Sequence, residues 1–296
     1  MLTKTPLRYP GGKSLMTSLF IEMFEINHLE HITYAEPYAG GAGTAINLLL
    51  GNKVNRIFIN DANIGIYSFW TAILNDTRRF VDRILTVPLT LDEWRIQHGL
   101  LKTANAPSFE LGFATFYLSR TNRSGILNAG PIGGSSEEKQ VSATYQLGCR
   151  FNRNDLVNKV LNISERRKNI VVSNKDAIKF LKNLKGEGKF VYLDPPYYVK
   201  GKSLYLDYYS EKDHSLLAQY LKSTNKFSWV LSYDNVEAIR KLYSDYELYE
   251  FDLKYTANLK KTGAELLTYS HDLILPSEKV IRRREMNLSL KKIVLH

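Results

Sequence analysis

The amino-acid sequence predicts an α/β protein whose alternation of strands and helices is interrupted by a large helical insert. Short apolar, β-prone stretches occur at residues 32–36, 56–61 and 189–193, and each has the length of a buried strand. From about residue 64 to residue 168 the alternation stops, and the pattern is helical and rich in aromatic residues. Strand and helix patterns then resume. This order is typical of an α/β domain that carries an inserted domain.

The composition is ordinary for a soluble globular protein, apart from its charge. The chain of 296 residues is long enough for one large domain and a smaller inserted one, and 44% of its residues are hydrophobic. Forty basic residues exceed thirty acidic ones, which gives a net charge of +10. Such an excess favours a nucleic acid as the partner, although it also suits simple solubility.

Several classes of site and location are disfavoured by the sequence. Cys149 is the single cysteine, so no disulfide forms within the chain, and this usage is typical of a reducing cytoplasm. The six histidines are scattered, and neither CxxC nor HxxxH occurs, so we expect no metal site. We find no signal-peptide core and no apolar stretch of about 18 residues. We therefore expect a cytoplasmic protein that is not inserted in a membrane.

The most informative motif is Asp194-Pro195-Pro196-Tyr197, directly after the apolar stretch at residues 189–193. It should lie at the carboxyl end of a buried strand, where open α/β sheets bind ligands. The two prolines stiffen the loop and remove two N–H donors, so its carbonyls can only accept hydrogen bonds. The carboxylate adds an anionic acceptor, and the tyrosine adds an aromatic face. The loop could hold an amino group on a stacked heterocycle, or it could be only a rigid turn.

Residues 7–14 end in Gly12-Lys13-Ser14, which invites comparison with a phosphate-binding loop. That motif needs a glycine where this chain has Leu7, so we do not expect a nucleoside triphosphate site. A Gly-Gly turn that begins a helix over residues 13–26 fits the pattern better. The exposed N–H groups of such a turn, together with Lys13, suit a carboxylate or another anion.

Residues 32–50 predict a strand, a glycine-rich turn at residues 40–43 and a helix. The GxGxxG pattern of dinucleotide sites is missing because Ile46 occupies its last position, so the turn favours a nucleoside-type ligand. Asp61 ends the next predicted strand, 18 residues after the last glycine of the turn. From that distance an acidic side chain accepts hydrogen bonds from ribose hydroxyls. Asp61 could instead cap the helix that follows it.

The insert is predicted to be helical, with one polar loop and much of the charge. The loop covers residues 120–134 and mixes cations, amides and glycines, which suits contacts with phosphates and base edges, or an irregular solvated loop. A second cationic edge covers residues 149–153. Residues 65–170 hold 14 basic and 9 acidic side chains, half of the excess positive charge of the chain. Helical patterns cover residues 67–74, 77–85, 91–101, 109–119 and a segment ending near 167.

After the insert, residues 169–172 predict a strand, and residues 175–184 predict a helix capped by Ser173 or Asn174. Asp176 lies at this strand tip, where it could stabilise the helix start or accept from an adenine amino group. The tail from residue 279 is basic and is compatible with a surface helix, a DNA contact or a disordered end. The other expected elements are a capping box at 210–213 with a helix to 222, strands at 227–232, 246–253 and 264–275, and a helix at 236–243.

Four motifs, in this order and spacing, resemble those of the Dam-type (D12 class) DNA adenine N6-methyltransferases. They are the segments at residues 9–13 and 36–43, Asp61, and the Asp194 motif. The resemblance covers residues 6–275 and implies a Rossmann-like, mostly parallel seven-stranded S-adenosylmethionine-dependent methyltransferase sheet with an inserted, mostly helical target-recognition domain. It places the methyltransferase domain at residues 1–64 and 169–275, the target-recognition domain at 65–168 and a basic tail at 276–296.

The resemblance also assigns roles to individual residues. The product of the reaction would be S-adenosylhomocysteine, the substrate double-stranded DNA, and no metal would be required. Asp194 and the Pro195 carbonyl would accept from N6 of a flipped adenine that stacks on Tyr197, with Pro196 completing the catalytic loop. The cofactor-binding set is Tyr9, Lys13, Glu36, Pro37, Tyr38, Gly40, Asp61 and Asp176. From their place in the insert we take as candidate DNA contacts Arg120, Asn122, Arg123 and Asn128.

Two other classes of function remain open at this level. A methyltransferase that acts on RNA or on a protein amide could use a similar Pro-Pro-Tyr loop, and a catalytically silent DNA-binding subunit could retain the motifs. A cognate restriction enzyme is a further expected partner of such a methylase, whereas the sequence does not define the recognition sequence or the oligomeric state. Residues 260–267 resemble a late family segment only loosely, and they are not included in the expected site.

Overall fold

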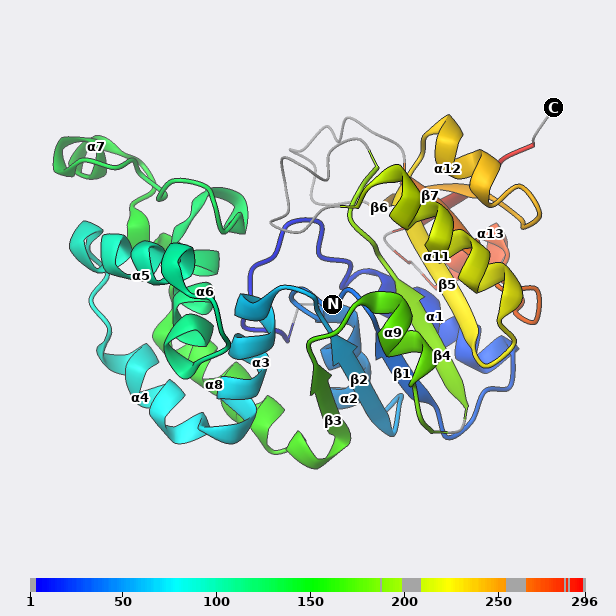
Figure 1. The fold of residues 1–296 in the computed structure, drawn as a ribbon, viewed down its shortest axis with the longest axis horizontal. Coiled ribbons are helices and arrows are strands. Elements are labelled where there is room, and N and C mark those ends of the chain that lie inside the picture. The colour runs from blue at the N-terminus through cyan, green and yellow to red at the C-terminus, as the bar shows by residue number, and fades with distance from the viewer. Residues whose placement is uncertain are drawn as a thin grey trace.

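A computed structural model of the protein describes residues 4–186, 188–198, 209–253, 265–284, 286 and 288–294. A single sheet lies between two layers of helices, and a separate group of helices packs beside the β3 edge of the sheet (Figure 1). The described part of the tyrosine-rich loop expected at residues 198–209 is limited to its two end residues.

The sheet of the described residues has eight strands in the order β3-β2-β1-β4-β5-β7-β6-β8. Neighbouring strands are parallel from β3 to β5, and the pairs that involve β7, β6 and β8 are antiparallel. This confirms the α/β class expected from the sequence. The strands are β1 (Thr33–Glu36), β2 (Arg56–Asn60), β3 (Ile170–Ser173), β4 (Lys189–Leu193), β5 (Ser228–Asp234), β6 (Tyr249–Leu253), β7 (Glu265–Tyr269) and β8 (Leu288–Lys292).

The sheet and the tail differ from the sequence expectations in two respects. Seven strands were implied by the resemblance, and the eighth is β8, which the basic tail adds beside β6. A disordered end is therefore wrong for residues 288–292, where alternate side chains, Leu288 and Leu290, are buried. The alternation supplies the apolar face that lets this short segment join the sheet.

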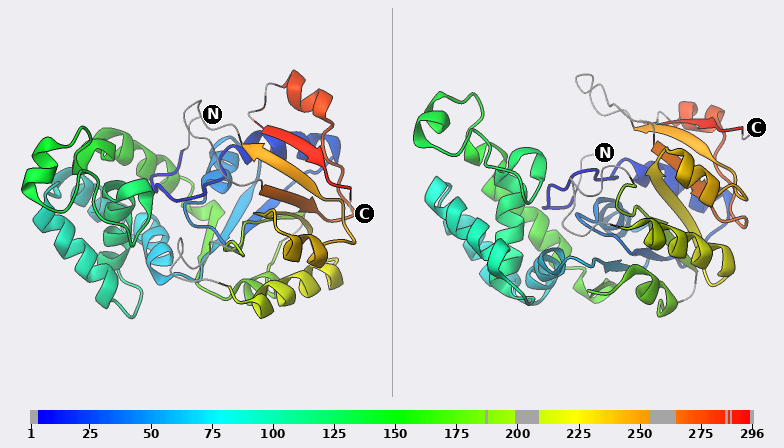
Figure 2. Two further views of the ribbon diagram at one scale, coloured as in Figure 1. Left: turned by 90° about the horizontal axis from the view of Figure 1, so that it is seen from above. Right: turned by 45° about the horizontal axis from the view of Figure 1, so that its top comes forward.

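Helices cover both faces of the sheet, and the side-chain alternation along β4 shows why. Phe190 and Tyr192 pack in the core under α1 and α2, whereas Val191 and Leu193 pack in the core under α9, α11 and α12. Figure 2 shows these layers on opposite faces. The helices of this part are α1 (Met16–Ile26), α2 (Gly43–Leu50), α9 (Ala177–Lys182), α11 (Glu211–Ser223), α12 (Glu237–Leu242) and α13 (Glu278–Arg283).

The segment between β2 and β3 forms the helical group beside the sheet, and all of it is described. Its centre is aromatic: the ring centroids of Phe69, Phe80 and Phe116 lie 5.3 to 6.1 Å apart. The expected insert boundaries fall at the start of α3 and just before β3. The helices are α3 (Ile64–Asn75), α4 (Thr77–Thr86), α5 (Leu91–Thr103), α6 (Phe109–Thr121), α7 (Glu137–Ser142) and α8 (Arg153–Ser164).

The residue that caps α9 differs from the two that the sequence predicts. Asp176, rather than Ser173 or Asn174, caps α9, and its carboxylate accepts from the Lys179 N–H at 2.9 Å. Ser173 instead belongs to β3 and donates to Asn60. The capping box at the start of α11 is confirmed, with Ser210 and Asp213 bonded reciprocally.

No helix in the described ranges combines the length and apolarity that a membrane crossing requires. Nor do the described residues contain a group of three or more His, Cys, Asp or Glu side chains arranged to hold a metal ion.

Candidate active site

Acidic side chains gather at the carboxyl edge of the parallel strands. Glu36 ends β1, Asp61 follows β2, and Asp194 follows β4. Because β2, β1 and β4 are adjacent and parallel, their carboxyl ends meet at one edge of the sheet. Asp176 lies after β3 at the same edge, and its carboxylate is exposed. The sequence motifs are thus brought together as expected for a ligand site of an open α/β sheet.

Asp194 is held in place by two side chains from other elements. Its Oδ1 accepts a hydrogen bond from Ser232 Oγ of β5 at 2.6 Å, and Lys13 Nζ lies 3.1 and 3.0 Å from its two oxygens. Burial raises the pKa of the Asp194 carboxyl; the Lys13 ammonium opposes this and Glu265 adds to it. Pro195 next to it is buried. The loop that begins at Asp194 is therefore held in place by contacts within the protein.

Lys13 lies inside the protein, where it binds Asp194 and Tyr197. Only 2% of its side chain is exposed, and its ammonium also donates to the Gly11 carbonyl at 3.0 Å and to Tyr197 Oη at 3.3 Å. Burial alone would lower the pKa of Lys13, but the carboxylates of Asp194 and Glu265 outweigh burial and raise the pKa well above its ordinary value. Lys13 is thus a buried cation that neutralises the Asp194 carboxylate.

Glu265 of β7 is a site residue that the sequence did not indicate clearly. Its carboxylate lies 3.4 Å from Lys13 Nζ and accepts from Tyr197 Oη at 3.4 Å, and 5% of its side chain is exposed. It belongs to the segment at residues 260–267, of which residues 260–264 lie outside the described ranges. The loose family resemblance of that segment was the available signal. A second signal was the presence of a charged residue, Glu265, at the start of an apolar strand.

Glu36 is buried at the end of β1, and its hydrogen bonds with Tyr34 and Ala45 both reach one oxygen. Oε1 accepts from Tyr34 Oη at 2.9 Å and from the Ala45 N–H at 3.0 Å. Burial raises the pKa of Glu36 to about 8, although these two hydrogen bonds lower it, and the charge of Asp194 raises it further. Glu36 is therefore largely protonated at neutral pH until a cation comes close.

We expect Glu36→Gln to stabilise the folded protein in alkaline solution. Between about pH 4.5 and pH 8 the folded protein keeps a proton on Glu36 that the unfolded chain has lost, so the free energy of unfolding falls as pH rises. The neutral, similarly shaped glutamine removes this loss. Urea denaturation should show the variant more stable than the wild type by on the order of 4 kcal/mol at pH 8 and equal to it near pH 4.5. A difference that is independent of pH would contradict the burial of an ionisable Glu36.

The glycine turn after β1 is braced from two sides. The Gly40 N–H donates to Asp61 Oδ2 at 2.8 Å, and the Gly40 carbonyl accepts from Trp70 Nε1 of α3 at 3.0 Å. Gly40 has a φ of +46°, and a Cβ there would lie 2.7 Å from the Tyr9 ring. Glycine is thus required both by the left-handed backbone and by the close approach of Tyr9. Asp61 also accepts from the Asn63 N–H at 2.9 Å, so it shapes the turn as well as the start of α3.

The remaining cofactor candidates lie around this turn. The Pro37 carbonyl accepts from Asn60 Nδ2 at 3.0 Å, and Asn60 also binds the Lys175 carbonyl at 2.9 Å. Asn60 is a buried residue that the sequence analysis did not select, and it ties the ends of β1 and β3 to β2. Tyr38 Oη lies 2.7 Å from Tyr209 Oη. These contacts fix the rim of the site on the side of the glycine turn.

Of the four insert candidates, Asn122 is buried, Arg120 is half-buried, and Arg123 and Asn128 are exposed. Asn122 is completely buried, and its amide accepts from Trp94 Nε1 at 2.7 Å and donates to the Ile126 and Leu127 carbonyls. Arg120 donates to the Pro6 carbonyl at 2.6 Å. Burial and the nearby Arg8 lower the pKa of Arg120 to about 10, although Asp155 opposes them. These two side chains hold the loop and the N-terminal segment together.

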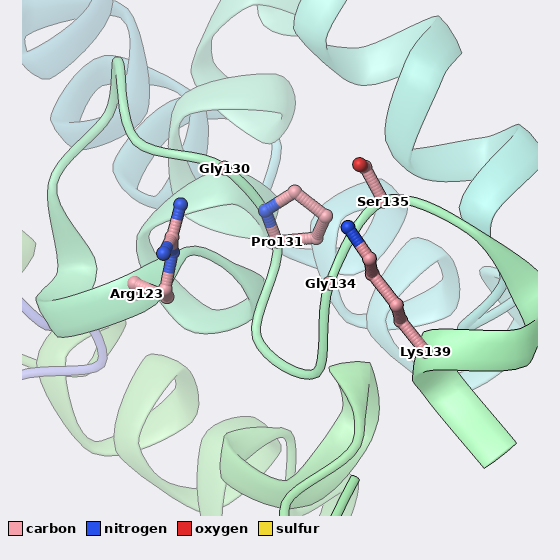
Figure 3. A pocket seen from close by; sticks show the side chains of 6 residues that line it. All are labelled: Arg123, Gly130, Pro131, Gly134, Ser135 and Lys139. Atoms are coloured by element: carbon pink, nitrogen blue, oxygen red, sulfur yellow. The ribbon is translucent and has the colours of Figure 1, made fainter. Parts of the chain in front are cut away.

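Arg123 and Asn128 are exposed on the same loop. Arg123 lines a pocket with Gly130, Pro131, Gly134, Ser135 and Lys139. Figure 3 shows the Arg123 and Lys139 side chains on either side of Pro131. Lys139, at the start of α7, was not selected from the sequence, because a charged residue on a short polar helix is ordinarily only solvated.

Sequence comparisons agree with this arrangement. The chain is 25% identical over 244 residues, 80% of its length and 86% of the relative, to the Type II methyltransferase M.CviBI of Paramecium bursaria Chlorella virus NC1A. It is 24% identical over 281 residues, 88% of its length and 94% of the relative, to the Type II methyltransferase M.MjaIII of Methanocaldococcus jannaschii. Residues 9–257 match the sequence model of one family, which includes every strand tip described above, and the chain belongs to that family, the D12 class N6 adenine-specific DNA methyltransferases.

Proposed function

We propose that the protein is a site-specific DNA methyltransferase that transfers a methyl group from S-adenosylmethionine to N6 of a flipped adenine in duplex DNA. The observation that carries this proposal is the placement of Asp194, held by Ser232 and Lys13 beside the glycine turn and the buried Glu36. Adenine specificity in DNA is the property of the family to which the chain belongs. The family relationship and the geometry thus support the same reaction.

The residues at the strand tips fit a cationic, nucleoside-type methyl donor. The Asp61 carboxylate and the buried Glu36, which loses its proton when a cation comes close, suit a sulfonium and an ammonium group. Tyr38, Gly40 and Asp61 would hold the methionine and ribose side, and Asp176 the adenine amino group. When bound, the donor supplies an electrophilic methyl group on sulfur.

The chain itself has to make a poor nucleophile reactive. The N6 lone pair of adenine is delocalised into the ring, so acceptors for its two hydrogens shift N6 toward tetrahedral geometry. Asp194 and the Pro195 carbonyl are placed at the end of β4 to be these acceptors, and Tyr197 offers a stacking face. The Asp194 carboxylate would also hold the proton that N6 sheds. Positioning and charge placement in a largely buried site would supply most of the acceleration.

The test is transfer of a labelled methyl group. The purified protein is incubated with labelled S-adenosylmethionine and with duplex DNA, RNA or protein in parallel, and the DNA is digested to nucleosides. We expect the label in N6-methyladenine from duplex DNA. Label found only in RNA, in protein or in cytosine would contradict the proposal, and sequencing of the methylated DNA would define the recognition sequence.

The insert is the proposed DNA-recognition part, and Arg123 and Asn128 are its proposed contacts. Extruding a base costs a few kcal/mol, which stacking and phosphate contacts have to offset. The pocket between Arg123 and Lys139 offers two cations and two glycines, which lack side chains and allow close approach of a phosphate or a base edge. As a DNA-acting protein it would work in the cytoplasm at the nucleoid. The Type II relatives support a restriction enzyme of the same specificity as its partner.

We expect Arg123→Ala to weaken DNA binding by about 3-fold to 10-fold near 0.1 M salt and to reduce the slope of log K against log salt by about 1. The reason is the loss of one cation that displaces counterions from DNA. The measurement is fluorescence anisotropy of labelled duplex DNA at several salt concentrations. Arg167→Ala is the matched control, because Arg167 is exposed at the amino end of β3, away from the strand tips of the site. Equal salt slopes for the two variants would contradict a DNA contact by Arg123.

A further inference from the structure

The ammonium of Lys13 has more acceptors than it can satisfy. It has three protons, and among the described residues it contacts the two Asp194 oxygens, the Gly11 carbonyl, Tyr197 Oη and Glu265. The ammonium is therefore shared between two carboxylates that come from different strands, β4 and β7. In the proposed reaction the Asp194 oxygens have to accept from a substrate amine, and Lys13 competes with that amine for the same oxygens.

Glu265 gives the ammonium a second charged partner within the same buried cluster. It lies 3.4 Å from Lys13 Nζ, and it also accepts from Tyr197 Oη, so it contacts both the cation on Asp194 and the last residue of the catalytic loop. In the register of β5 and β7, Glu265 pairs with Asp234, two residues beyond Ser232, the donor to Asp194. The antiparallel strand β7 thus reaches the carboxyl edge of the parallel strands with this single carboxylate.

We propose that Glu265 is a positioning residue for adenine methylation, which retains the Lys13 ammonium when a substrate amine takes the Asp194 oxygens and which orients Tyr197. This inference rests on the proposed function. Glu265 acts through Lys13 and Tyr197 and does not itself touch the reacting atoms. Without its charge, Asp194 is the sole carboxylate among the described partners of a buried ammonium, and the substrate amine has to break that pair.

Glu265→Gln tests the charge while keeping the shape and most of the hydrogen-bonding capacity. We expect kcat for methyl transfer to fall by about 10-fold to 100-fold. KM for the methyl donor and the affinity for duplex DNA should stay within about threefold of the wild type. Thr268→Val is the control, because Thr268 is a completely buried polar residue of the same strand and is not among the described contacts of Lys13. It should keep kcat within about threefold.

The pH profile separates positioning from mere packing. The charge of Glu265 helps to raise the pKa of Asp194, so Glu265→Gln should move the acidic limb of the kcat profile to lower pH. Glu36 titrates in both the wild type and Glu265→Gln, so its effect on kcat cancels when the two pH profiles are compared. The groups that face Asp194 among the described residues are Lys13, Glu36, Glu265 and the phenols of Tyr34, Tyr192 and Tyr233.

A double variant tests the inference if Glu265→Gln alone does not fold. Lys13→Gln combined with Glu265→Gln removes both charges together, and its kcat should equal that of Lys13→Gln alone, because Glu265 acts through Lys13. Losses that multiply would overturn the inference. So would wild-type kcat with an unmoved acidic limb in Glu265→Gln, or a loss confined to binding. If the wild-type protein itself moves no label to DNA, the proposed function fails, which is a separate outcome.

Discussion

Replacing Asp194 by alanine is expected to lower kcat for DNA methylation by about 10²-fold to 10³-fold, the cost of removing one well-placed electrostatic group from an enzyme site. The alanine removes the charged acceptor for N6 and leaves the buried Lys13 without its nearest carboxylate. The measurement is single-turnover transfer of labelled methyl groups to duplex DNA at saturating donor. DNA and donor affinities should change little, because Asp194 is one contact among several strand-tip residues.

Two further variants define what Asp194 contributes. Asp194→Asn keeps one acceptor oxygen without the charge, so it should retain more activity than Asp194→Ala. Ser232→Ala leaves the carboxylate but removes its 2.6 Å hydrogen bond, and it should cost about 10-fold or less. If Asp194→Ala transferred methyl groups at the wild-type rate, the proposed mechanism would be wrong.

The second large effect is expected on stability, from Gly112→Ala in α6. A Cβ at this position would lie 2.6 Å from the Ser68 carbonyl carbon and 2.9 Å from the Phe69 nitrogen, both in the backbone of α3. Backbone cannot move aside as a flexible side chain can, so the two helices have to separate. Overpacking of this kind typically costs 1 to 3 kcal/mol, and we expect about 3 kcal/mol or more here. Urea denaturation followed by tryptophan fluorescence measures it, since Trp70 and Trp94 lie in the insert.

Gly99→Ala is the matched control for this substitution. Gly99 lies in the neighbouring helix α5, it is exposed, and a Cβ there would meet nothing within 4 Å. The same chemical change should therefore stabilise the protein by roughly 0.5 to 1 kcal/mol through helix propensity. Equal shifts in the denaturation midpoint for both variants would show that α3 and α6 are not in close contact.

The sequence was sufficient to predict the strand tips because the signals there are local. An apolar stretch followed at once by Asp194 or Asp61 places the carboxylate at a strand end, whatever the rest of the chain does. The same locality explains the capping box at Ser210, which depends on residues three positions apart. The convergence of these residues then follows from the parallel arrangement of β2, β1 and β4.

Contacts between distant segments could not be predicted in the same way. Lys13 and Glu265 are 252 positions apart in the sequence, and only the antiparallel return of β7 brings them together. In the polar loop of the insert no periodicity tells inward from outward side chains. Asn122 therefore looked like an exposed amide, although it is completely buried. The sequence left two roles for Asp176, the helix start and the adenine amino group, and the structure shows its carboxylate capping α9.

The tail strand β8 covers an edge of the sheet that would otherwise be open. β6 pairs with β7 on one side and with β8 on the other, so a chain that ended before residue 288 would leave the backbone of β6 as an open edge. Open edges invite strands from other molecules and lead to aggregation. β8 takes the edge position instead, with Lys291 and Lys292 exposed on it, and lysines at an edge disfavour such pairing. The basic residues of the tail thus disfavour the pairing of this edge with strands of other molecules.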